Sequence, residues 1–331
     1  MSNNVKLLVC VVTALPFGAY AGGSNYGIVP GALPNLAGKV SEWPVPTPRF
    51  ARDPAIAPDG SVYIAVMTGN KVARFDPKTR TFKEWDLPSR HRPHGLLVDR
   101  GGIVWTTGNG NGTIGKLDPA TGKVIEYKTP SGGGGPHTLV ITDDQSTIWF
   151  TMQSGDKLAR LETKTGRIVE YETSGGPYGL ALDKAGNVWF CRMGDNRMGR
   201  LEPTTGRMTE VDTGRGSRPR RVAADRDGML WITYYGNGKL AKLDPKAMKV
   251  VKTYDLPGDN AGAYAVTVDG AGMVWANEIN NDTVVRFDPK TERMQVVQLP
   301  SSGVGIRKMV TDANGRLWYM GSHNGRLGVV E

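Results

Sequence analysis

Residues 92–130 contain four short runs that decide the fold: Arg92-Pro-His-Gly-Leu-Leu-Val-Asp, Ile103-Val-Trp-Thr-Thr, Thr113-Ile-Gly-Lys-Leu-Asp-Pro and Lys123-Val-Ile-Glu-Tyr-Lys-Thr-Pro. Within each run the apolar residues alternate with polar ones or are β-branched, and Gly, Asn, Asp and Pro fill the gaps between runs. This pattern is typical of antiparallel strands joined by tight turns rather than of helices. The stretch therefore predicts one four-stranded sheet.

The tryptophan of the second run recurs along the whole chain. Its six positions are Trp105, Trp149, Trp189, Trp231, Trp275 and Trp318. Successive tryptophans are 44, 40, 42, 44 and 43 residues apart, and Tyr63 stands 42 residues before the first of them. Repeats of about forty residues with four strands each are the sequence signature of β-propeller blades. We therefore predict an all-β fold, a seven-bladed β-propeller of four-stranded antiparallel blades with the tryptophans in its core.

The two ends of the repeat array complement each other. The last unit stops after its third strand at Glu331, whereas the N-terminal stretch Lys39-Val-Ser-Glu-Trp-Pro-Val-Pro resembles a fourth strand. We therefore predict that this N-terminal strand completes the last blade and that the propeller spans residues 39–331. Such closure joins the ends of the ring and leaves no open sheet edge.

The residues before the propeller resemble an export signal. Lys6 precedes an apolar run over residues 7–17, and small residues follow as Ala19-Tyr-Ala. This predicts a secretory signal peptide over residues 1–21, a linker over residues 22–38 and a periplasmic or secreted protein. The apolar run is too short to span a bilayer, so we expect no stable membrane insertion. Cys10 lies in this run, which leaves Cys191 without a disulfide partner in the mature chain.

The charge of the chain is moderately basic. The formal net charge is +9 at pH 7, but the positive residues are dispersed over every blade. Because nucleic-acid binding needs a clustered basic patch, we expect no nucleic-acid partner. We expect instead a monomer whose partner is a small-molecule substrate or ligand.

Two positions of the repeat hold different residues in different blades. A position used only for packing would hold similar residues in every blade. The first slot lies at the start of each innermost strand and holds Arg52, His94, His137, Tyr178, Arg220, Tyr264 and Arg307. The second slot lies three residues after the tryptophan and holds Val66, Gly108, Met152, Arg192, Tyr234, Glu278 and Gly321. Because the first two strands of a blade are antiparallel, both slots are expected at one mouth of the central channel.

The chemistry of these slots predicts a binding site. Guanidinium, imidazole and phenol groups dominate them, and Glu278 is the single acid. Such a pocket suits an anionic or carbonyl-bearing ligand. The alternative is that these side chains only solvate the rim of the channel, as polar residues do in propellers that serve as scaffolds.

Several units resemble one enzyme family. The runs Gly176-Pro-Tyr-Gly-Leu-Ala-Leu-Asp, Gly186-Asn-Val-Trp-Phe, Asn196-Arg-Met-Gly-Arg-Leu and Gly206-Arg-Met-Thr-Glu resemble the streptogramin B lyase (virginiamycin B lyase) family of seven-bladed propellers, over about residues 39–331. The resemblance implies an enzyme that opens a cyclic depsipeptide antibiotic at its ester by elimination, and hence antibiotic resistance. It also implies Mg²⁺ held by carboxylates and a histidine as general base.

The family's motifs map onto particular residues of this chain. Its Pro-His element is present as Pro93-His94 and Pro136-His137, and the glutamate of its second-strand motif is present as Glu278. The resemblance thus implies His94 and His137 as catalytic bases and Glu278 as the Mg²⁺ ligand, with Asp195 and Asp282 as the next candidate ligands. The other first-slot residues, expected to bind substrate, are Arg52, Tyr178, Arg220, Tyr264 and Arg307. His323 has no equivalent in the other repeats and is a further candidate.

Two alternative functions remain at this point. One is a metal-dependent lactone hydrolase of the gluconolactonase type, although Arg52 stands where that enzyme would need an acidic ligand. The other is a non-catalytic exported module that uses the arginines and histidines of the first slot to hold an anion. Loss of function on chelation would distinguish the metalloenzymes from the binding module.

Overall fold

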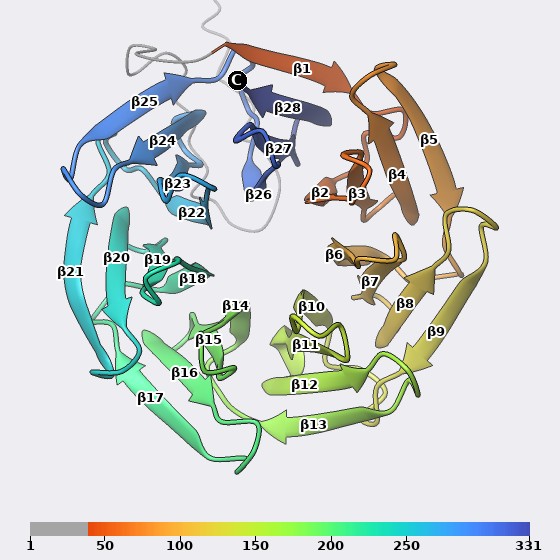
Figure 1. Cartoon of the computed structure of the whole chain (residues 1–331), viewed down its shortest axis with the longest axis horizontal. Helices are drawn as coiled ribbons and strands as arrows, with labels where there is room; N and C mark the ends of the chain where they lie inside the picture. The colour runs from red at the N-terminus through yellow and green to blue at the C-terminus, as the bar shows by residue number, and fades with distance from the viewer. Residues whose placement is uncertain (1–38) are drawn as a thin grey trace, which may run out of the picture.

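The structure, a computed structural model, describes residues 39–331. Seven four-stranded antiparallel sheets are arranged as blades around a central axis (Figure 1). The predicted all-β, seven-bladed β-propeller is therefore confirmed. The predicted signal peptide, residues 1–21, and linker, residues 22–38, lie outside the described residues.

Each blade runs from an inner strand at the axis to an outer strand at the rim. The inner strands are β2 (Ala51–Ile56), β6 (Pro93–Val98), β10 (Pro136–Ile141), β14 (Pro177–Leu182), β18 (Pro219–Ala224), β22 (Ala263–Val268) and β26 (Ile306–Thr311). The second strands are β3 (Val62–Val66), β7 (Val104–Gly108), β11 (Thr147–Met152), β15 (Val188–Arg192), β19 (Leu230–Tyr234), β23 (Val274–Glu278) and β27 (Leu317–Gly321).

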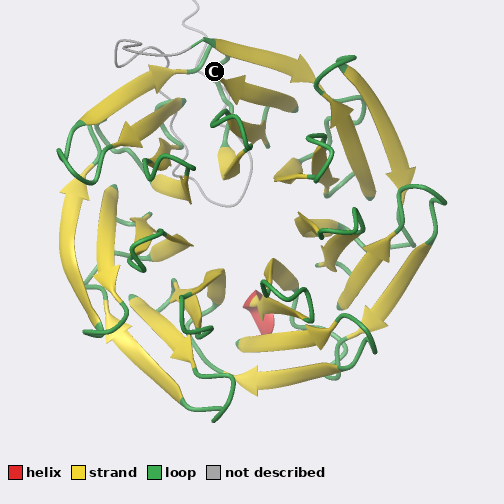
Figure 2. Ribbon diagram, in the orientation of Figure 1, coloured by secondary structure: helices red, strands yellow, loops and turns green. Residues whose placement is uncertain are grey.

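The third and outer strands complete the blades. The third strands are β4 (Lys71–Asp76), β8 (Thr113–Leu117), β12 (Lys157–Glu162), β16 (Arg197–Leu201), β20 (Lys239–Asp244), β24 (Thr283–Phe287) and β28 (Arg326–Val330). The outer strands are β5 (Thr81–Asp86), β9 (Val124–Lys128), β13 (Ile168–Glu172), β17 (Met208–Asp212), β21 (Lys249–Asp255), β25 (Met294–Gln298) and β1 (Val40–Pro44). One 3-10 turn, η1 (Gln153–Gly155), is the single helical element of residues 39–331 (Figure 2). No helix in that range is long and apolar enough to cross a membrane.

The N-terminal strand closes the ring as predicted. β1 pairs with β28 in antiparallel register, from Val40 opposite Val330 to Pro44 opposite Arg326. The amide of Glu331 also donates to the carbonyl of Lys39 at 2.9 Å. The outer strand of the last blade is therefore supplied by the other end of the propeller, which ties the two ends together.

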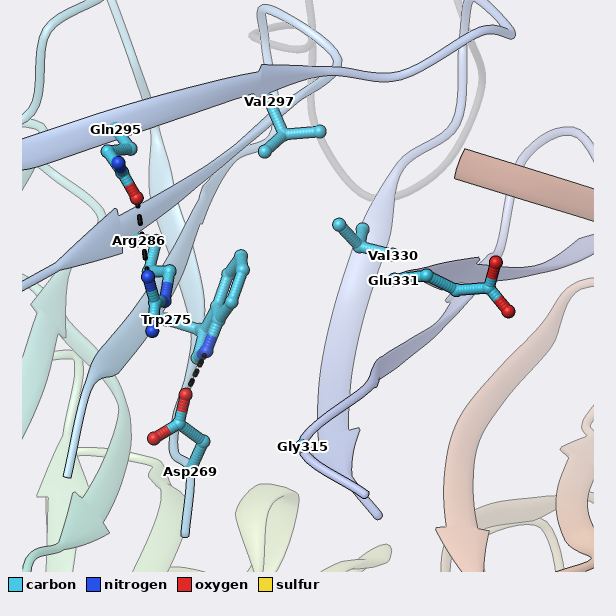
Figure 3. A pocket seen from close by; sticks show the side chains of 8 residues that line it. All are labelled: Asp269, Trp275, Arg286, Gln295, Val297, Gly315, Val330 and Glu331. Carbon is cyan, nitrogen blue, oxygen red and sulfur yellow. Dashed lines mark hydrogen bonds between the residues drawn. The ribbon is translucent and has the colours of Figure 1, made fainter. Parts of the chain in front are cut away.

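The repeated tryptophans hold the blades together from within. All six are buried. In five blades the indole Nε1 donates to an aspartate six residues earlier, at 2.8–2.9 Å, in the pairs Asp99–Trp105, Asp183–Trp189, Asp225–Trp231, Asp269–Trp275 and Asp312–Trp318. Figure 3 shows one pair, with Arg286 beside the indole of Trp275 at the edge of a cavity of about 250 Å³. Because Trp buries a large area and five of the polar tips are satisfied by aspartate, the tryptophans belong to the core, as predicted.

Candidate functional site

Every inner strand is irregular near its start, and this irregularity builds the site. In β6, Pro93 lies opposite Gly108 and Leu96 lies opposite Thr106, so that His94 and Gly95 together face one residue, Thr107, of β7. The same two-against-one count occurs in the other six blades. Such a β-bulge re-aims the side chains beside it. Two successive residues of one strand therefore reach the axis: Arg220 contacts the Tyr178 hydroxyl and Arg221 contacts Asp53.

A hydroxyl from the second strand stabilises the bulge and joins adjacent blades. Thr107 Oγ1 accepts from the amide of Gly95 at 2.7 Å and donates to the carbonyl of His137, in the next blade, at 2.9 Å. Thr151 and Thr233 make the equivalent pairs of bonds in their blades. Each of these threonines fixes the backbone of a site residue in the neighbouring blade.

Cys191 takes the place of this threonine in its blade. It lies two residues after Trp189, is fully buried and packs within a hydrophobic cluster. Burial raises the pKa of its thiol, so it is not an activated nucleophile. It is a core residue.

The seven first-slot residues predicted from the sequence converge at the axis. We call this set the mouth ring: Arg52, His94, His137, Tyr178, Arg220, Tyr264 and Arg307. None of them is more than 8% exposed, and residues from blades far apart in the sequence contact one another directly. The convergence predicted for this slot is therefore what the structure shows.

One side of the mouth ring consists of arginines and tyrosines. Arg220 Nη2 donates to Tyr264 Oη at 2.8 Å and to Tyr178 Oη at 3.2 Å, and Arg307 Nη1 donates to Tyr264 Oη at 2.9 Å. The two tyrosine hydroxyls are also hydrogen-bonded to each other. Arg52 differs, because its buried Nε and Nη2 have no hydrogen-bond partner among the described residues. A buried guanidinium with unused donors is an available site for an anionic group.

The other side of the mouth ring consists of the two histidines. The ring centroids of His94 and His137 are 3.6 Å apart. His94 Nδ1 lies 3.2 Å from the carbonyl of His137, so Nδ1 must carry the proton and donate it. Burial, followed by the charge of Arg52, holds the pKa of His94 well below its ordinary value. Burial and then Arg221 do the same to the pKa of His137, so both imidazoles are neutral near pH 7.

His323 joins the mouth ring from the loop between β27 and β28. Its Nε2 lies 3.2 Å from Arg307 Nη2, and its imidazole stacks on Phe50 with 6.4 Å between the ring centroids. Burial, then Arg307 and Arg52, lower the pKa of His323 to about 4. The structure thus places this residue beside the predicted site, although no repeat marked its position.

A second layer of charged residues lies directly behind the mouth ring, and sequence reasoning missed it. Arg221 Nη2 pairs with Asp53 Oδ1 at 3.3 Å, and its Nη1 donates to Thr138 Oγ1 at 2.8 Å. Lys308 Nζ donates to the carbonyl of Leu96 at 3.0 Å. Burial lowers the pKa of Lys308. Asp53, Arg221 and Lys308 each directly follow a mouth-ring residue in the sequence. A charged residue at that position of the repeat was the signal that could have revealed the second layer.

The remaining length of the channel is lined mainly by apolar side chains. A cavity of about 390 Å³ is lined by Thr138, Arg221 and Lys308 from the second layer and by residues from the later part of the inner strands. We call five of the latter the lower layer: Val140, Ala181, Ala223, Thr267 and Val310. Each lower-layer residue is paired with the tryptophan of its own blade. Charged groups are therefore concentrated in one half of the channel, and Asp143 is the one other charged residue that lines this cavity.

The second slot does not line the mouth, contrary to the prediction. Glu278 is paired with Ala263, the residue before the mouth-ring residue Tyr264, and the same one-residue offset holds in every blade. Since successive side chains of a strand point to opposite faces, this offset directs the second slot away from the axis. The Glu278 carboxylate accepts instead from the amide of Gly258 at 2.7 Å and from the Thr283 hydroxyl.

The carboxylates proposed as Mg²⁺ ligands are already used by the protein. Besides Glu278, Asp282 accepts from the amides of Gly303 and Val304 at 2.8 and 2.9 Å, and Asp195 pairs with Arg192. Within residues 39–331, no group of three or more His, Cys, Asp and Glu side chains is arranged to hold a metal ion. Because Mg²⁺ prefers carboxylate, carbonyl and water oxygens, the cationic and aromatic mouth ring does not fit it.

Fold and site together define a seven-bladed β-propeller whose channel is closed at one end by a cationic and aromatic cluster. Residues 92–331 match the model of the Virginiamycin B lyase family, and the chain belongs to that family. No curated protein matches the sequence.

Solved structures agree with this assignment at the level of the fold. A streptogramin B lyase has 24% identity and a TM-score of 0.82, over 88% of this chain and 97% of that protein. Virginiamycin B lyase from Staphylococcus aureus has 20% identity and a TM-score of 0.81, over 88% and 98%. A catalytically inactive histidine-to-alanine variant of that enzyme, with quinupristin, has 21% identity and a TM-score of 0.79, over 88% and 98%.

Proposed function

We propose that the mouth ring binds a small molecule that carries a carboxylate or an ester, and that the protein opens such an ester by elimination. One observation carries this proposal: three guanidinium groups meet two neutral imidazoles and two tyrosine side chains at the channel axis. Arginines hold carboxylates through charge-assisted hydrogen bonds. Asp53, the nearest acid behind the ring, is paired with Arg221. The cluster therefore keeps an excess of positive charge for an anionic ligand.

Elimination suits this arrangement because it creates a carboxylate. A base removes the proton from the carbon next to a carbonyl group, the carbon–oxygen bond of the ester breaks, and its electron pair leaves on the carboxylate. Fixed cations beside that oxygen stabilise the charge as it develops. Arg52, with two unused donors, is the residue that we assign to the leaving carboxylate. The resemblance to the family implies His94 or His137 as the base, but their depressed pKa makes both imidazoles weak bases at neutral pH.

The proposal involves no metal-dependent step, since the arginines supply the positive charge that Mg²⁺ would supply in the mechanism implied by the resemblance. Its test is mass spectrometry of cyclic depsipeptides and lactones after incubation with the protein, with Mg²⁺ or with a chelator. Elimination leaves the mass of a cyclic substrate unchanged, whereas hydrolysis adds one water. We expect a product of unchanged mass in both conditions. A product that disappears with chelator would restore the metal-dependent mechanism, and a gain of one water would indicate a lactonase.

Arginine variants test the site assignment. Arg52→Met should abolish product formation, because it removes the cation that receives the carboxylate. Arg192→Met is the matched control, because Arg192 lies at the end of β15, in the second slot, and pairs with Asp195 and Glu210 instead of the ring. Equal activity in both variants would contradict the assignment.

A non-catalytic role in anion binding is the second candidate. The deep burial of all seven mouth-ring residues favours it, because a closed cluster retains a ligand better than it exchanges products. Calorimetry with the same compounds separates the two functions: heat of binding without formation of any product supports the non-catalytic binding module.

We also propose that residues 1–21 direct export and are removed, which N-terminal sequencing of the exported protein would test.

A further inference from the structure

The hydroxyl of Tyr264 lies at the centre of the mouth ring and is surrounded by donors. Arg220 Nη2 and Arg307 Nη1 approach its oxygen at 2.8 and 2.9 Å, and the Tyr178 hydroxyl is hydrogen-bonded to it. Guanidinium groups only donate hydrogen bonds. Tyr264 Oη is therefore used mainly as an acceptor.

The hydrogen bonds of the two tyrosines favour one shared proton. Each hydroxyl brings one proton, and among the described residues each is hydrogen-bonded only to the other hydroxyl and to arginines. A single proton shared between the two oxygens satisfies all of these donors, so the contacts favour a phenol paired with a phenolate. The negative charge belongs on Tyr264, which accepts from two arginines, while Tyr178 accepts from one at 3.2 Å.

Charged groups from all sides act on this oxygen in the same direction. Burial by itself raises the pKa of Tyr264, but Arg220, Arg307, Arg52 and Arg221 lower it well below its ordinary value. The other titratable groups around the axis are His94, His137, Tyr178, His323, Lys308 and Asp53. Of these, Asp53 is the one acid, and it is paired with Arg221.

The same cations have opposite consequences for the two kinds of candidate base. A general base works best when its pKa is near the working pH. Phenol starts at about 10 and imidazole at about 6.5. Positive surroundings therefore move Tyr264 toward neutral pH and move His94 and His137 away from it.

We infer that Tyr264, held as a phenolate by Arg220 and Arg307, is the proton acceptor of the mouth ring. In the elimination, its oxygen takes the proton next to the carbonyl group, the carbon–oxygen bond breaks, and the electron pair leaves on the carboxylate that Arg52 receives. The phenol then returns the proton to water. This catalytic role rests on the proposed function, but the charge state of Tyr264 does not.

Ultraviolet absorption tests the charge state without any substrate. The wild-type protein should show the tyrosinate band of one residue at about pH 7, and Tyr264→Phe should lack it. Tyr234→Phe is the matched control and should keep the band, because Tyr234 Oη is buried without a hydrogen-bond partner among residues 39–331 and burial raises its pKa. Arg307→Met should abolish the band at pH 7 while leaving Tyr264 in place. Identical spectra of the wild type and Tyr264→Phe would overturn the inference.

Turnover of any ester opened in the mass-spectrometric test examines the catalytic role. Tyr264→Phe should lower kcat by about 100-fold or more, with circular dichroism unchanged. His94→Gln should lower kcat less than Tyr264→Phe does. The fall of the rate at acid pH, which reports protonation of the base, should persist in His94→Gln and be absent in Tyr264→Phe. Full activity of Tyr264→Phe would exclude the role even if the tyrosinate band is present. If no compound is opened, the proposed function fails, whereas the spectra still decide the charge state.

Discussion

The two halves of the central channel are built from the same strands but differ completely in chemistry. On β18, Arg220 belongs to the mouth ring and Ala223, three residues later, belongs to the lower layer. The mouth ring holds arginine, histidine and tyrosine, while the lower layer holds Ala, Val and Thr. The same seven strands form both halves, and the lower half is built with small, mainly apolar residues. The propeller fold itself therefore does not require the polar residues. Their concentration at one end is the reason for proposing that end as the functional one.

The second layer separates these two halves, and breaking it should have the largest effect. Arg221→Met leaves the fully buried Asp53 without its cation. We expect a loss of about 3–5 kcal/mol in the free energy of unfolding, because an uncompensated buried charge is costly. Denaturant unfolding measures it. The double variant Arg221→Met with Asp53→Asn should recover part of the loss; a single variant as stable as the wild type would show that the pair is not structural.

Acid should destabilise the folded protein through the buried histidines of the mouth ring. The folded-state pKa of His94 and of His137 is depressed, so below about pH 6.5 the unfolded chain binds protons that the folded chain does not. Stability is therefore full above that pH and falls as the pH decreases, by up to about 1.4 kcal/mol per pH unit for each histidine. Unfolding at pH 7 and at lower pH measures the slope. His137→Gln should flatten it, and an unchanged slope would contradict neutral histidines.

The threonine that joins adjacent blades should matter less than the charges. Thr107→Val removes the acceptor of the Gly95 amide and the donor to the His137 carbonyl. The expected cost is about 1–3 kcal/mol in unfolding free energy, since both backbone groups stay buried. Thr209→Val is the control, because the buried Thr209 hydroxyl has no partner among the described residues. Equal stability of the two variants would mean that the inter-blade bond contributes nothing.

The lower layer should tolerate polar substitution best. Val140→Thr keeps the shape of a side chain that is partly exposed to the apolar cavity. We expect the free energy of unfolding to change by less than about 1 kcal/mol and any turnover to stay unchanged. A loss of turnover as large as that of Arg52→Met would show that the functional site extends through the whole channel.

The repeat pattern was enough to predict the fold and half of the site. The tryptophan spacing predicted seven blades, and the orphan strand before Val45 predicted the closure of the ring. Polar residues at a position that should be apolar predicted the mouth ring. Glu278 shows where this reasoning fails: its place at the end of β23 was right, but a one-residue offset in register turned its side chain away from the axis.

The sequence by itself therefore determined the architecture and the identity of the residues that meet at the axis, because strand period, turn residues and repeat length are local properties of the chain. Only the tertiary structure decided which of these residues bond to one another. The β-bulges rotate two successive side chains inward, which creates the second layer of Arg221, Asp53 and Lys308. The packing of neighbouring blades brings Tyr264 of β22 between Arg220 of β18 and Arg307 of β26. This three-dimensional proximity of charges, absent from any single repeat, is what shifts the pKa of Tyr264.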